Sequence, residues 1–458
     1  MKTLWQKDSN ELPGREFFHQ FTTGEDRLWD HHLIPYDILV NIAQARMLQR
    51  TGVYNDSELK SVTHTLSDLY DKWSNGIFTL SEEDEDVHSA TEKYLTEQTG
   101  ETGKRIHTGR SRNDQVVADI NLALKDQIRE LCGEVLTVLH QLDKIAKTHN
   151  GIYFAGMTHT QPAMPSSADS WASGYIRMLI NDLNSILHAY DQVDFSPLGS
   201  AAGYGVPHIK MEREYIAEQL GFSKMMAEVT AAQPIRSASA LKIAHSLEYI
   251  GLTYNRMAAD IIEFLRSDII TLSDNQTSGS SIMPQKRNPD LWELIRGSFH
   301  RIAGAGRELS GIAANLTSGY HRDLQPVKAV IMQALRDIRD VTKAVQFGID
   351  GLSFNKEGCQ NTITQEVMAT HFANEQVNAG VPFREAYRKT AQQLSEIKLP
   401  DHAALKATYS HTGAPGHYPE KNISDDIDEI SSWLKTEQTK WDKVKSNLLG
   451  AVDGLALR

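Results

Sequence analysis

The sequence predicts an all-α protein organised around a long central bundle of helices, with smaller helical regions before and after it. Apolar residues recur every three or four positions over five long stretches, the first of which includes Ile120, Leu124 and Ile128. No alternation of strands and helices is visible, and the glycines of 199–205 lack the order of a dinucleotide-binding loop. A helix of about 25 residues is roughly 35–40 Å long. These stretches therefore predict long rods that pack nearly side by side.

Three segments follow from this pattern. Residues 1–106 are expected to form a mostly helical N-terminal domain, 107–350 the bundle with the catalytic loops, and 351–458 a small helical C-terminal domain. In the first segment, Asp37–Leu48 reads as an amphipathic helix. In the last, shorter helices are expected near 364–379 and 383–397. The acidic runs 82–84 and 425–429 are interpreted as solvated helix surface.

The bulk composition excludes several classes of protein. The chain has 458 residues, of which 40% are hydrophobic, and a formal net charge of −12. This acidic balance and the absence of a long basic run argue against a nucleic-acid partner. No apolar run approaches membrane-spanning length, and residues 1–8 lack the apolar core of a signal peptide. We therefore expect no membrane contact and a cytoplasmic location.

Cysteine and histidine spacing gives no sign of a bound metal. Cys132 and Cys359 form no CxxC pair, so both are expected to be core thiols. The histidines show no ligand spacing such as HExxH. We expect neither a metal nor an organic cofactor.

The first polar segment joins the N-terminal region to the bundle. Residues 107–115 carry two guanidinium groups, Arg110 and Arg112, beside Ser111 and Asn113. Arginine binds a carboxylate with two parallel hydrogen bonds, which lysine cannot do. A helix that begins near Asp114 would point backbone N–H groups toward a bound anion. A solvated turn could carry the same composition. His88, a short way upstream, is a further candidate for binding.

The second polar segment, 156–165, separates the first two long helices. Pro162 and Pro165 cannot continue a helix, so His159 lies on a break between two rigid rods. Such a position suits a group that transfers protons. A lone loop histidine is more often simply solvated. The neighbouring Thr158, Thr160 and Gln161 favour a functional role.

The third polar segment, 277–289, has the composition of a mobile loop. It combines hydroxyl groups and glycine with Lys286 and Arg287, and its only apolar anchors are Ile282 and Met283. Asn288 and Pro289 are expected to open the next helix, with Asn288 as its N-cap. Ammonium, hydroxyl and amide groups beside a helix N-terminus suit a dicarboxylate, and a mobile loop can close over one. A solvated Ser/Gly linker is the alternative.

Two more polar segments complete the set. Residues 319–328 contain Tyr320, Gln325 and Lys328, with Pro326 marking a helix start. Residues 230–239 contain Gln233 and Arg236. Because all these segments lie at the ends of long rods, packing between neighbouring chains would bring them together. Apolar side chains on a second face of the rods, such as Leu122 and Leu136, predict the same kind of packing.

The motifs resemble those of the argininosuccinate lyases, a family of the fumarase/aspartase superfamily. The resemblance rests on Met283-Pro284-Gln285-Lys286 followed by Asn288-Pro289-Asp290, on the 107–115 run, on the Thr-His-x-Gln motif at 158–161 and on the Tyr-x-x-Asp-x-Gln-x-x-Lys run at 320–328. Residues 230–239 depart from the family pattern, since only Gln233 and Arg236 offer comparable polar chemistry.

The resemblance implies a lyase of arginine biosynthesis that splits argininosuccinate into arginine and fumarate by anti elimination. Ser280 would be the base, His159 oriented by Glu293 the acid, and Lys286 the stabilising cation. The substrate-binding groups would be Ser111, Arg112, Asn113, Thr158, Asn288, Tyr320, Gln325 and Lys328, with His88, Gln233 and Arg236 as further candidates. The family forms tetramers and builds each site from three subunits, so a homotetramer with shared sites is implied.

Two other functions remain open. The unusual 230–239 segment is compatible with another fumarate-releasing lyase of the superfamily, acting on adenylosuccinate or an N-substituted aspartate. A non-catalytic structural protein like the lens delta-crystallins is the second alternative. That alternative predicts lost site residues, whereas Ser280, Lys286, Asn288, His159 and Glu293 are all present.

Overall fold

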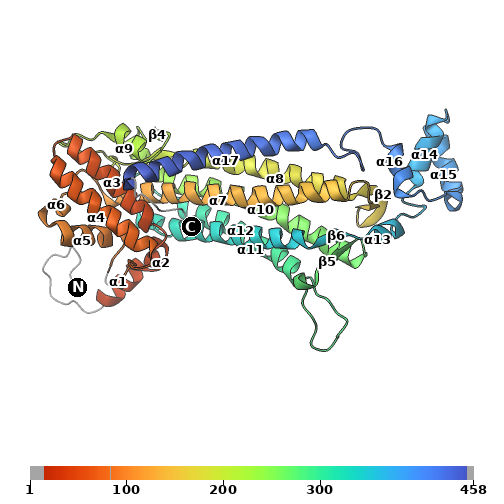
Figure 1. Cartoon of the computed structure of the whole chain (residues 1–458), viewed down its shortest axis with the longest axis horizontal. Helices are drawn as coiled ribbons and strands as arrows, with labels where there is room; N and C mark the ends of the chain where they lie inside the picture. The colour runs from red at the N-terminus through yellow and green to blue at the C-terminus, as the bar shows by residue number, and fades with distance from the viewer. Residues whose placement is uncertain (1–14, 83, 451–458) are drawn as a thin grey trace.

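Long helices dominate the molecule, which is elongated in a computed structural model that describes residues 15–82 and 84–450. Figure 1 shows short helices of the N-terminal region at one end, the long helices in the middle and further short helices at the other end. The predicted all-α class is confirmed. The expectations for residues 1–8 and for Glu83 fall outside the described residues.

The predicted central bundle consists of five long helices that pack against one another. They are α7 (Arg112–Thr148), α8 (Ala168–Asp191), α10 (Pro234–Arg266), α11 (Asp290–Ala313) and α12 (Val327–Asp350). The apolar stripe read from the sequence is buried, since Ile120, Leu124 and Ile128 are at most 3% exposed. The expected core thiols, Cys132 and Cys359, are also buried.

Local sequence explains where α7 begins. Ser111 is its N-cap and accepts a hydrogen bond from the backbone N–H of Asn113 (3.2 Å), while the Asp114 carboxylate accepts one from the N–H of Ser111 (2.9 Å). This reciprocal capping satisfies donors that a helix start leaves open. The Asp114 carboxylate also accepts from the N–H groups of Gly199 (3.0 Å) and Ala201 (2.8 Å), which ties the 197–203 turn to this helix end.

The N-terminal region packs beside this end of the bundle. Its helices are α1 (Arg15–Thr23), α2 (Asp26–Asp30), α3 (Ile34–Arg50), α4 (Asp56–Ser74), α5 (Val87–Thr99) and α6 (Glu101–Lys104). The expected helix over 37–48 is present as part of α3. It is buried nearly all round rather than on one face, because α4, α5, α7, α9 (Arg213–Gln219) and α17 (Glu420–Leu449) all pack against it.

The opposite end contains two of the three small sheets formed by the described residues. Strands β1 (Tyr153–Thr158) and β2 (Gln161–Ser167) form an antiparallel hairpin, and β5 (Ile270–Leu272) pairs antiparallel with β6 (Leu352–Phe354). The short helices α13 (Lys356–Asn361), α14 (Ala369–Asn378), α15 (Phe383–Gln392) and α16 (His402–Thr408) lie beyond them. Elsewhere, α9 (Arg213–Gln219) follows β3 (Phe195–Ser196), which pairs with β4 (Lys224–Met225).

The last helix returns along the bundle. α17 (Glu420–Leu449) packs against α7, α3 and α8, with Ile423, Ile427 and Ile430 buried. Asp425, Asp428 and Glu429 on its other face are exposed, as the acidic run predicted. The C-terminal segment therefore contributes a sixth long helix to the bundle as well as the cluster of short helices.

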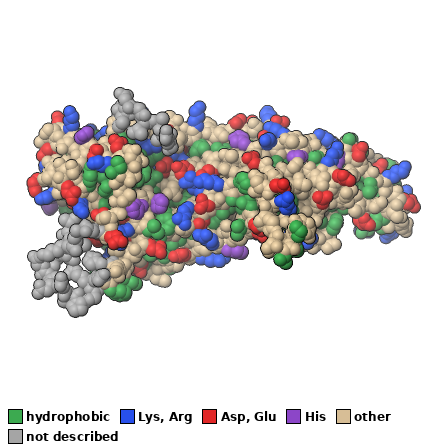
Figure 2. Space-filling view, turned by 60° about the horizontal axis from the view of Figure 1, so that its bottom comes forward, with side chains coloured by type: hydrophobic (Ala, Val, Ile, Leu, Met, Phe, Trp, Pro, Cys, Tyr) green, Lys and Arg blue, Asp and Glu red, His purple; other side chains and the backbone are tan. Residues whose placement is uncertain are grey.

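The surface carries mixed charges. Figure 2 shows one face on which Lys and Arg side chains are interspersed with Asp and Glu along the length of the molecule. Among the described residues, no helix is both long enough and apolar enough to cross a membrane.

Candidate active site

One group of the candidate residues gathers where α7, α10 and α12 begin, next to the N-terminal helices. Lys328, on the first turn of α12, is 3% exposed and lies between two carboxylates of α2. Its ammonium is 2.9 Å from Asp26 and also pairs with Asp30. Burial disfavours the charged amine, but the two carboxylates outweigh it and raise the pKa of Lys328. The lysine is therefore a fixed cation held between carboxylates in the protein interior.

Arg236 and Gln233 lie near the same cation. Arg236 is 6% exposed, its Nε has no hydrogen-bond partner, and its charge is felt by Tyr320, Asp26 and Asp30. Gln233 donates from Nε2 to the backbone carbonyl of Asn113 (2.9 Å), and its Oε1 is buried without a partner. Both residues of the unusual 230–239 segment thus join the substrate-binding candidates of 111–113 to those of 320–328.

The remaining candidates at this end hold neighbouring segments together. Arg112 pairs with Asp86 (2.7 Å) and Glu85 (3.3 Å) of the segment before α5. Gln325 donates from Nε2 to the carbonyl of Thr22 (2.9 Å) at the end of α1. Ser111 and Asn113 are partly exposed beside them. These contacts join the 107–115 segment and α12 to the N-terminal helices.

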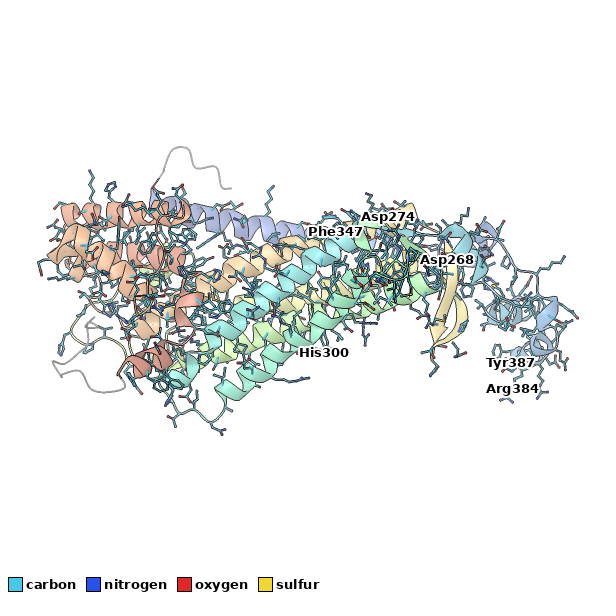
Figure 3. All side chains as sticks on the ribbon, turned by 90° about the horizontal axis from the view of Figure 1, so that it is seen from below. Asp268, Asp274, His300, Phe347, Arg384 and Tyr387 are labelled. Carbon is cyan, nitrogen blue, oxygen red and sulfur yellow. The ribbon has the colours of Figure 1, made fainter. Side chains whose placement is uncertain are left out.

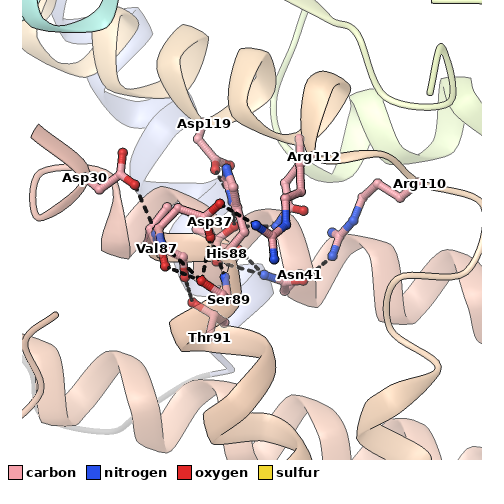
Figure 4. A network of polar contacts seen from close by, with 12 residues as sticks. Asp30, Asp37, Asn41, Val87, His88, Ser89, Thr91, Arg110, Arg112 and Asp119 are labelled. Carbon is pink, nitrogen blue, oxygen red and sulfur yellow. Dashed lines mark hydrogen bonds and ion pairs between the residues drawn. The ribbon is translucent and has the colours of Figure 1, made fainter. Parts of the chain in front are cut away.

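His88 lies inside a buried polar cluster (Figure 4). Its Nδ1 is 2.9 Å from Asp37 of α3 and 3.4 Å from Asp119 of α7. Asp37 also accepts from Gln115 Nε2 (2.5 Å) and contacts Asn41 (3.1 Å). Burial opposes the imidazolium, but the hydrogen bond and charge of Asp37 raise the pKa of His88 above its usual value. Burial and the Asp37 carboxylate raise the pKa of Asp119 well above its usual range.

This cluster is the one group of described residues with metal-ligand geometry. Ligand atoms of Asp37, His88 and Asp119 all lie within 4.8 Å of one another. The guanidinium of Arg110 is also buried there, donating to Asn41 Oδ1 (2.6 Å), and its charge is felt by both carboxylates. The cluster already holds an imidazolium and a guanidinium, which the carboxylates of Asp37 and Asp119 at most neutralise, so a divalent cation would leave the buried cluster with excess positive charge. The donor set fits an internal ion-pair network better than a metal.

A second group of candidates lies on the β1–β2 hairpin. Thr158 ends β1, and His159 and Thr160 form a two-residue turn in which both have positive φ, 51° and 61°. Positive φ at both turn positions matches the twist of a hairpin. Thr158, His159 and Gln161 are all exposed. The expected break between two helices is confirmed, and its form is a projecting hairpin that carries an imidazole at its tip.

The third group lies on the loop 277–289, which projects from the bundle (Figure 1). Its base is closed by backbone hydrogen bonds between Ser278 and Asn288 (3.1 and 2.9 Å). The expectation that Asn288 caps α11 was wrong: Pro289 is the N-cap position, and the Asn288 side chain turns across the base toward Gly279 O (3.4 Å). Pairing with Ser278 explains the difference, because it keeps Asn288 in an extended conformation.

Within this loop the candidate base has a distinctive surrounding. Ser280 Oγ accepts from the backbone N–H groups of Met283 (3.2 Å) and Ile282 (3.4 Å). Two N–H groups aimed at one oxygen favour a negative charge on it. Lys286 is exposed, and so is Glu293 on the first turn of α11. The loop therefore presents its cation and hydroxyl outward, without enclosing them.

The first group lies far from the other two within one chain. α7 has 37 residues and is therefore roughly 55 Å long, with Ser111–Asn113 at its start and the hairpin beyond its end. In Figure 3, Asp274 just before the loop lies near Asp268 at the hairpin end of the bundle, while Arg384 and Tyr387 of α15 lie at the far tip. A single chain brings together the substrate-binding candidates of 88–113, 233–236 and 320–328, but it leaves Thr158, His159 and the loop with Asn288 away from them.

Sequence reasoning missed the acidic partners in this region. Asp26 and Asp30 hold Lys328, and Asp37 and Asp119 hold His88. Asp37 and Asp119 are each flanked by apolar helical residues, whereas Asp26 lies in a short charged run, 25–27, that the sequence analysis did not single out. For Asp37 and Asp119 the available signal was a charge at an otherwise apolar helix position, which in a buried helix requires a partner.

Known proteins share the sequence pattern and the fold of this chain. A family model described as Lyase matches residues 15–304. The argininosuccinate lyase of Thermotoga neapolitana is 38% identical over 397 residues, which covers 86% of this chain and 99% of the relative. That of Phocaeicola vulgatus is 33% identical, covering 90% of this chain and 92% of the relative.

Solved structures share the fold at low sequence identity. An EDDS lyase in complex with formate has a TM-score of 0.77 at 18% identity, covering 96% of this chain and 95% of that one. The class II fumarase of Schistosoma mansoni has a TM-score of 0.68 at 15% identity, covering 89% and 91%. At such identities the likeness concerns the fold alone, while the sequence relatives carry the family. This chain belongs to the argininosuccinate lyase family.

Proposed function

We propose that this protein cleaves argininosuccinate into arginine and fumarate by anti elimination, as a step of arginine synthesis. One observation carries the proposal: relatives named argininosuccinate lyase align with this chain over nearly their whole length at 33–38% identity. The chain also carries Ser280, Lys286, Asn288, His159 and Glu293, the residues proposed for the chemical step. A cytoplasmic location and a small-molecule substrate belong to the same proposal.

In the proposed reaction, the loop 277–289 would supply the groups that stabilise the developing negative charge. Removing the proton beside a carboxylate puts a second negative charge on that carboxylate, so fixed cations and donors there lower the barrier most. Lys286 and Asn288 would supply them, with Thr158 as a further donor. Ser280 would take the proton as an alkoxide. The two backbone N–H groups directed at its Oγ support that role.

His159 would return a proton to the leaving guanidine, with Glu293 orienting it. The arginine part of the substrate would lie at the other group of residues, among Tyr320, Gln325 and Lys328. Ser111, Arg112 and Asn113, beside Gln233 and Arg236, would bind carboxylates of the substrate. His88 would act from beneath this surface, since it is only 6% exposed.

A homotetramer with sites shared between subunits would complete this arrangement. The ends of α7 are roughly 55 Å apart, so His159 and Asn113 of one chain cannot meet on one substrate. Neighbouring chains packed head to tail would bring the hairpin and loop of one chain to the Lys328 end of another. The mixed-subunit test is to combine His159→Ala and Lys328→Ala chains: shared sites predict recovered activity, and unshared sites predict none.

Fumarate release tests the function directly. Ultraviolet absorbance would be followed with argininosuccinate, adenylosuccinate and an N-substituted aspartate as separate substrates. Release from argininosuccinate that depends on Lys328 supports the proposal. Release only from adenylosuccinate or the N-substituted aspartate favours the second lyase function that the 230–239 segment leaves open. No release from any of them contradicts both.

A further inference from the structure

Strand β1, which leads to His159, lies between two separate hydrophobic cores. Its side chains alternate, as in any strand. Phe154 points into the core of the bundle, with its ring 5.0 Å from Phe264 and 5.9 Å from Phe354. Tyr153 and Ala155 point the other way, into a second core whose other buried members are Ile363, Val367, Met368, Ile397 and Leu405. The second core belongs to the short helices of residues 352–419, here called the small domain.

The free edge of β1 is hydrogen-bonded by side chains of the small domain. The N–H of Tyr153 donates to His402 Nδ1 (3.0 Å), and the N–H of Ala155 donates to Thr362 Oγ1 (2.8 Å). Both N–H groups lie on the edge away from β2, because alternate residues of a strand share an edge. An isolated two-stranded hairpin is only marginally stable. The two side chains therefore take the place of a third strand.

The loop between α16 and α17 fixes the base of the hairpin. Tyr153 Oη donates to the carbonyl of Pro415 (2.7 Å). The N–H of Gly416 donates to Ser167 Oγ (3.1 Å) and to Asp169 Oδ2 (3.0 Å), at the point where β2 passes into α8. Gly416 has a φ of +83°, and a Cβ there would overlap the Tyr153 hydroxyl. The contact thus requires glycine.

We propose that the small domain positions the hairpin that carries the acid His159, with Thr362 and His402 as the positioning residues. This inference rests on the proposed function, in which His159 donates a proton. The hairpin closes in two residues, so any shift of β1 passes directly to its tip. Neither Thr362 nor His402 contacts substrate in this arrangement; each acts through the backbone of β1.

The contact defines the state of His402. A ring nitrogen that accepts from Tyr153 N–H carries no proton, so Nε2 is the protonated nitrogen and donates to the carbonyl of Lys356 (3.4 Å). The charged neighbours are Lys356 and Asp401, and the Tyr153 ring stacks at 6.2 Å. Burial lowers the pKa of His402. Protonation in acid would remove the acceptor and release that edge of β1.

Thr362→Val is the first test, because it keeps the side-chain shape and removes the acceptor. We expect kcat for argininosuccinate to fall about 10–100-fold with KM little changed, since misplacing a catalytic group costs turnover. Thr362→Ser keeps the hydroxyl and should restore kcat. Thr390→Val is the matched control: it removes a buried hydroxyl of the same domain that bonds Gln376 and Ala386, away from β1. Equal kcat in Thr362→Val and Thr390→Val would overturn the proposal.

His402 gives an independent test, which also applies if Thr362→Val does not fold. Asparagine places an acceptor where Nδ1 stands, whereas alanine does not. His402→Asn should keep kcat and lose the part of the acid decline that comes from protonating His402. His402→Ala should lower kcat at all pH values. If both variants kept the wild-type kcat and the wild-type decline of activity in acid, the positioning role would be contradicted.

Amide hydrogen exchange separates failure of this inference from failure of the proposed function. The backbone amides of residues 153–158 should exchange faster in Thr362→Val than in Thr390→Val. This measurement requires no substrate, so it does not depend on which reaction the protein catalyses. If the wild-type protein released no fumarate, the proposed function would fail. The exchange comparison would still show whether the small domain holds the hairpin in place. Equal exchange in the two variants would overturn the coupling itself.

Discussion

The two ends of the bundle hold their functional groups in opposite ways. At the end next to the N-terminal helices, Lys328, Arg236 and His88 are 3–6% exposed and each faces charged neighbours. At the other end, His159 and Lys286 are exposed, and Ser280 is partly exposed, on a hairpin and a loop that project from the helices.

The difference follows from what each end is proposed to do. A buried charge must be paired, and the pairing fixes its position before substrate arrives. Such a region can discriminate between substrates. An exposed group on a projection has little local constraint, so its environment must come from loop closure and from another chain. The four predictions below set these two kinds of construction against each other.

Lys328→Ala should have the largest effect. It leaves Asp26 and Asp30 without their shared cation, and breaking a buried pair in this way typically costs about 3–5 kcal/mol. Both turnover and the free energy of unfolding should fall, as measured by fumarate release and urea titration. The double variant Lys328→Met/Asp30→Asn should recover part of the stability without the activity. An unchanged urea midpoint in Lys328→Ala would show that this end is not held by its charges.

Ser280→Ala should lower turnover strongly and leave the free energy of unfolding nearly unchanged. General acid–base catalysis by a positioned side chain typically contributes about 10²–10⁴-fold, so kcat should fall by roughly that factor. The side chain lies in a projecting loop, so the free energy of unfolding should change by less than about 0.5 kcal/mol. Ser281→Ala, at the exposed neighbouring position, is the control. Near-normal turnover in Ser280→Ala would remove this residue from the mechanism.

His88→Gln should have a pH-dependent effect on stability. The pKa of His88 is raised above its ordinary value of 6.5, so the folded protein binds the proton more tightly than the unfolded chain does. Its stabilising contribution is complete below pH about 6.5 and is lost as the pH rises through the folded-state pKa. Urea titrations of both proteins from pH 6 upward would measure this. A stability difference that grows with pH would contradict the assignment.

Asp274→Ala should have the smallest effect. Asp274 pairs with Arg287 across the loop base at 3.3 Å, and the side chains are 88% and 60% exposed. An exposed pair of this kind contributes at most about 1 kcal/mol. Turnover and thermal stability should both stay near wild type. A large loss of turnover would mean that this contact holds the loop in a required position, and the contrast between the two ends would weaken.

Periodicity by itself determined the all-α class, the five bundle helices and the position of each polar break. These are local properties: an apolar stripe every three or four residues needs a helix, and proline at 162 and 165 must interrupt one. The chemistry of the breaks also followed from residue types, because guanidinium, ammonium and hydroxyl groups in short runs suit an anionic substrate. The fate of Asn288 did not follow, since a partner ten residues away competed with its capping role.

Only the tertiary structure decided which groups are enclosed and what supports them. The pairing of Lys328 with Asp26 and Asp30 joins residues about 300 positions apart, and nothing local in either segment requires it. The same holds for the hairpin, whose edge is completed by Thr362 and His402 of the small domain. Burial and long-range hydrogen bonds depend on how helices pack, so a linear pattern of residue types does not contain them.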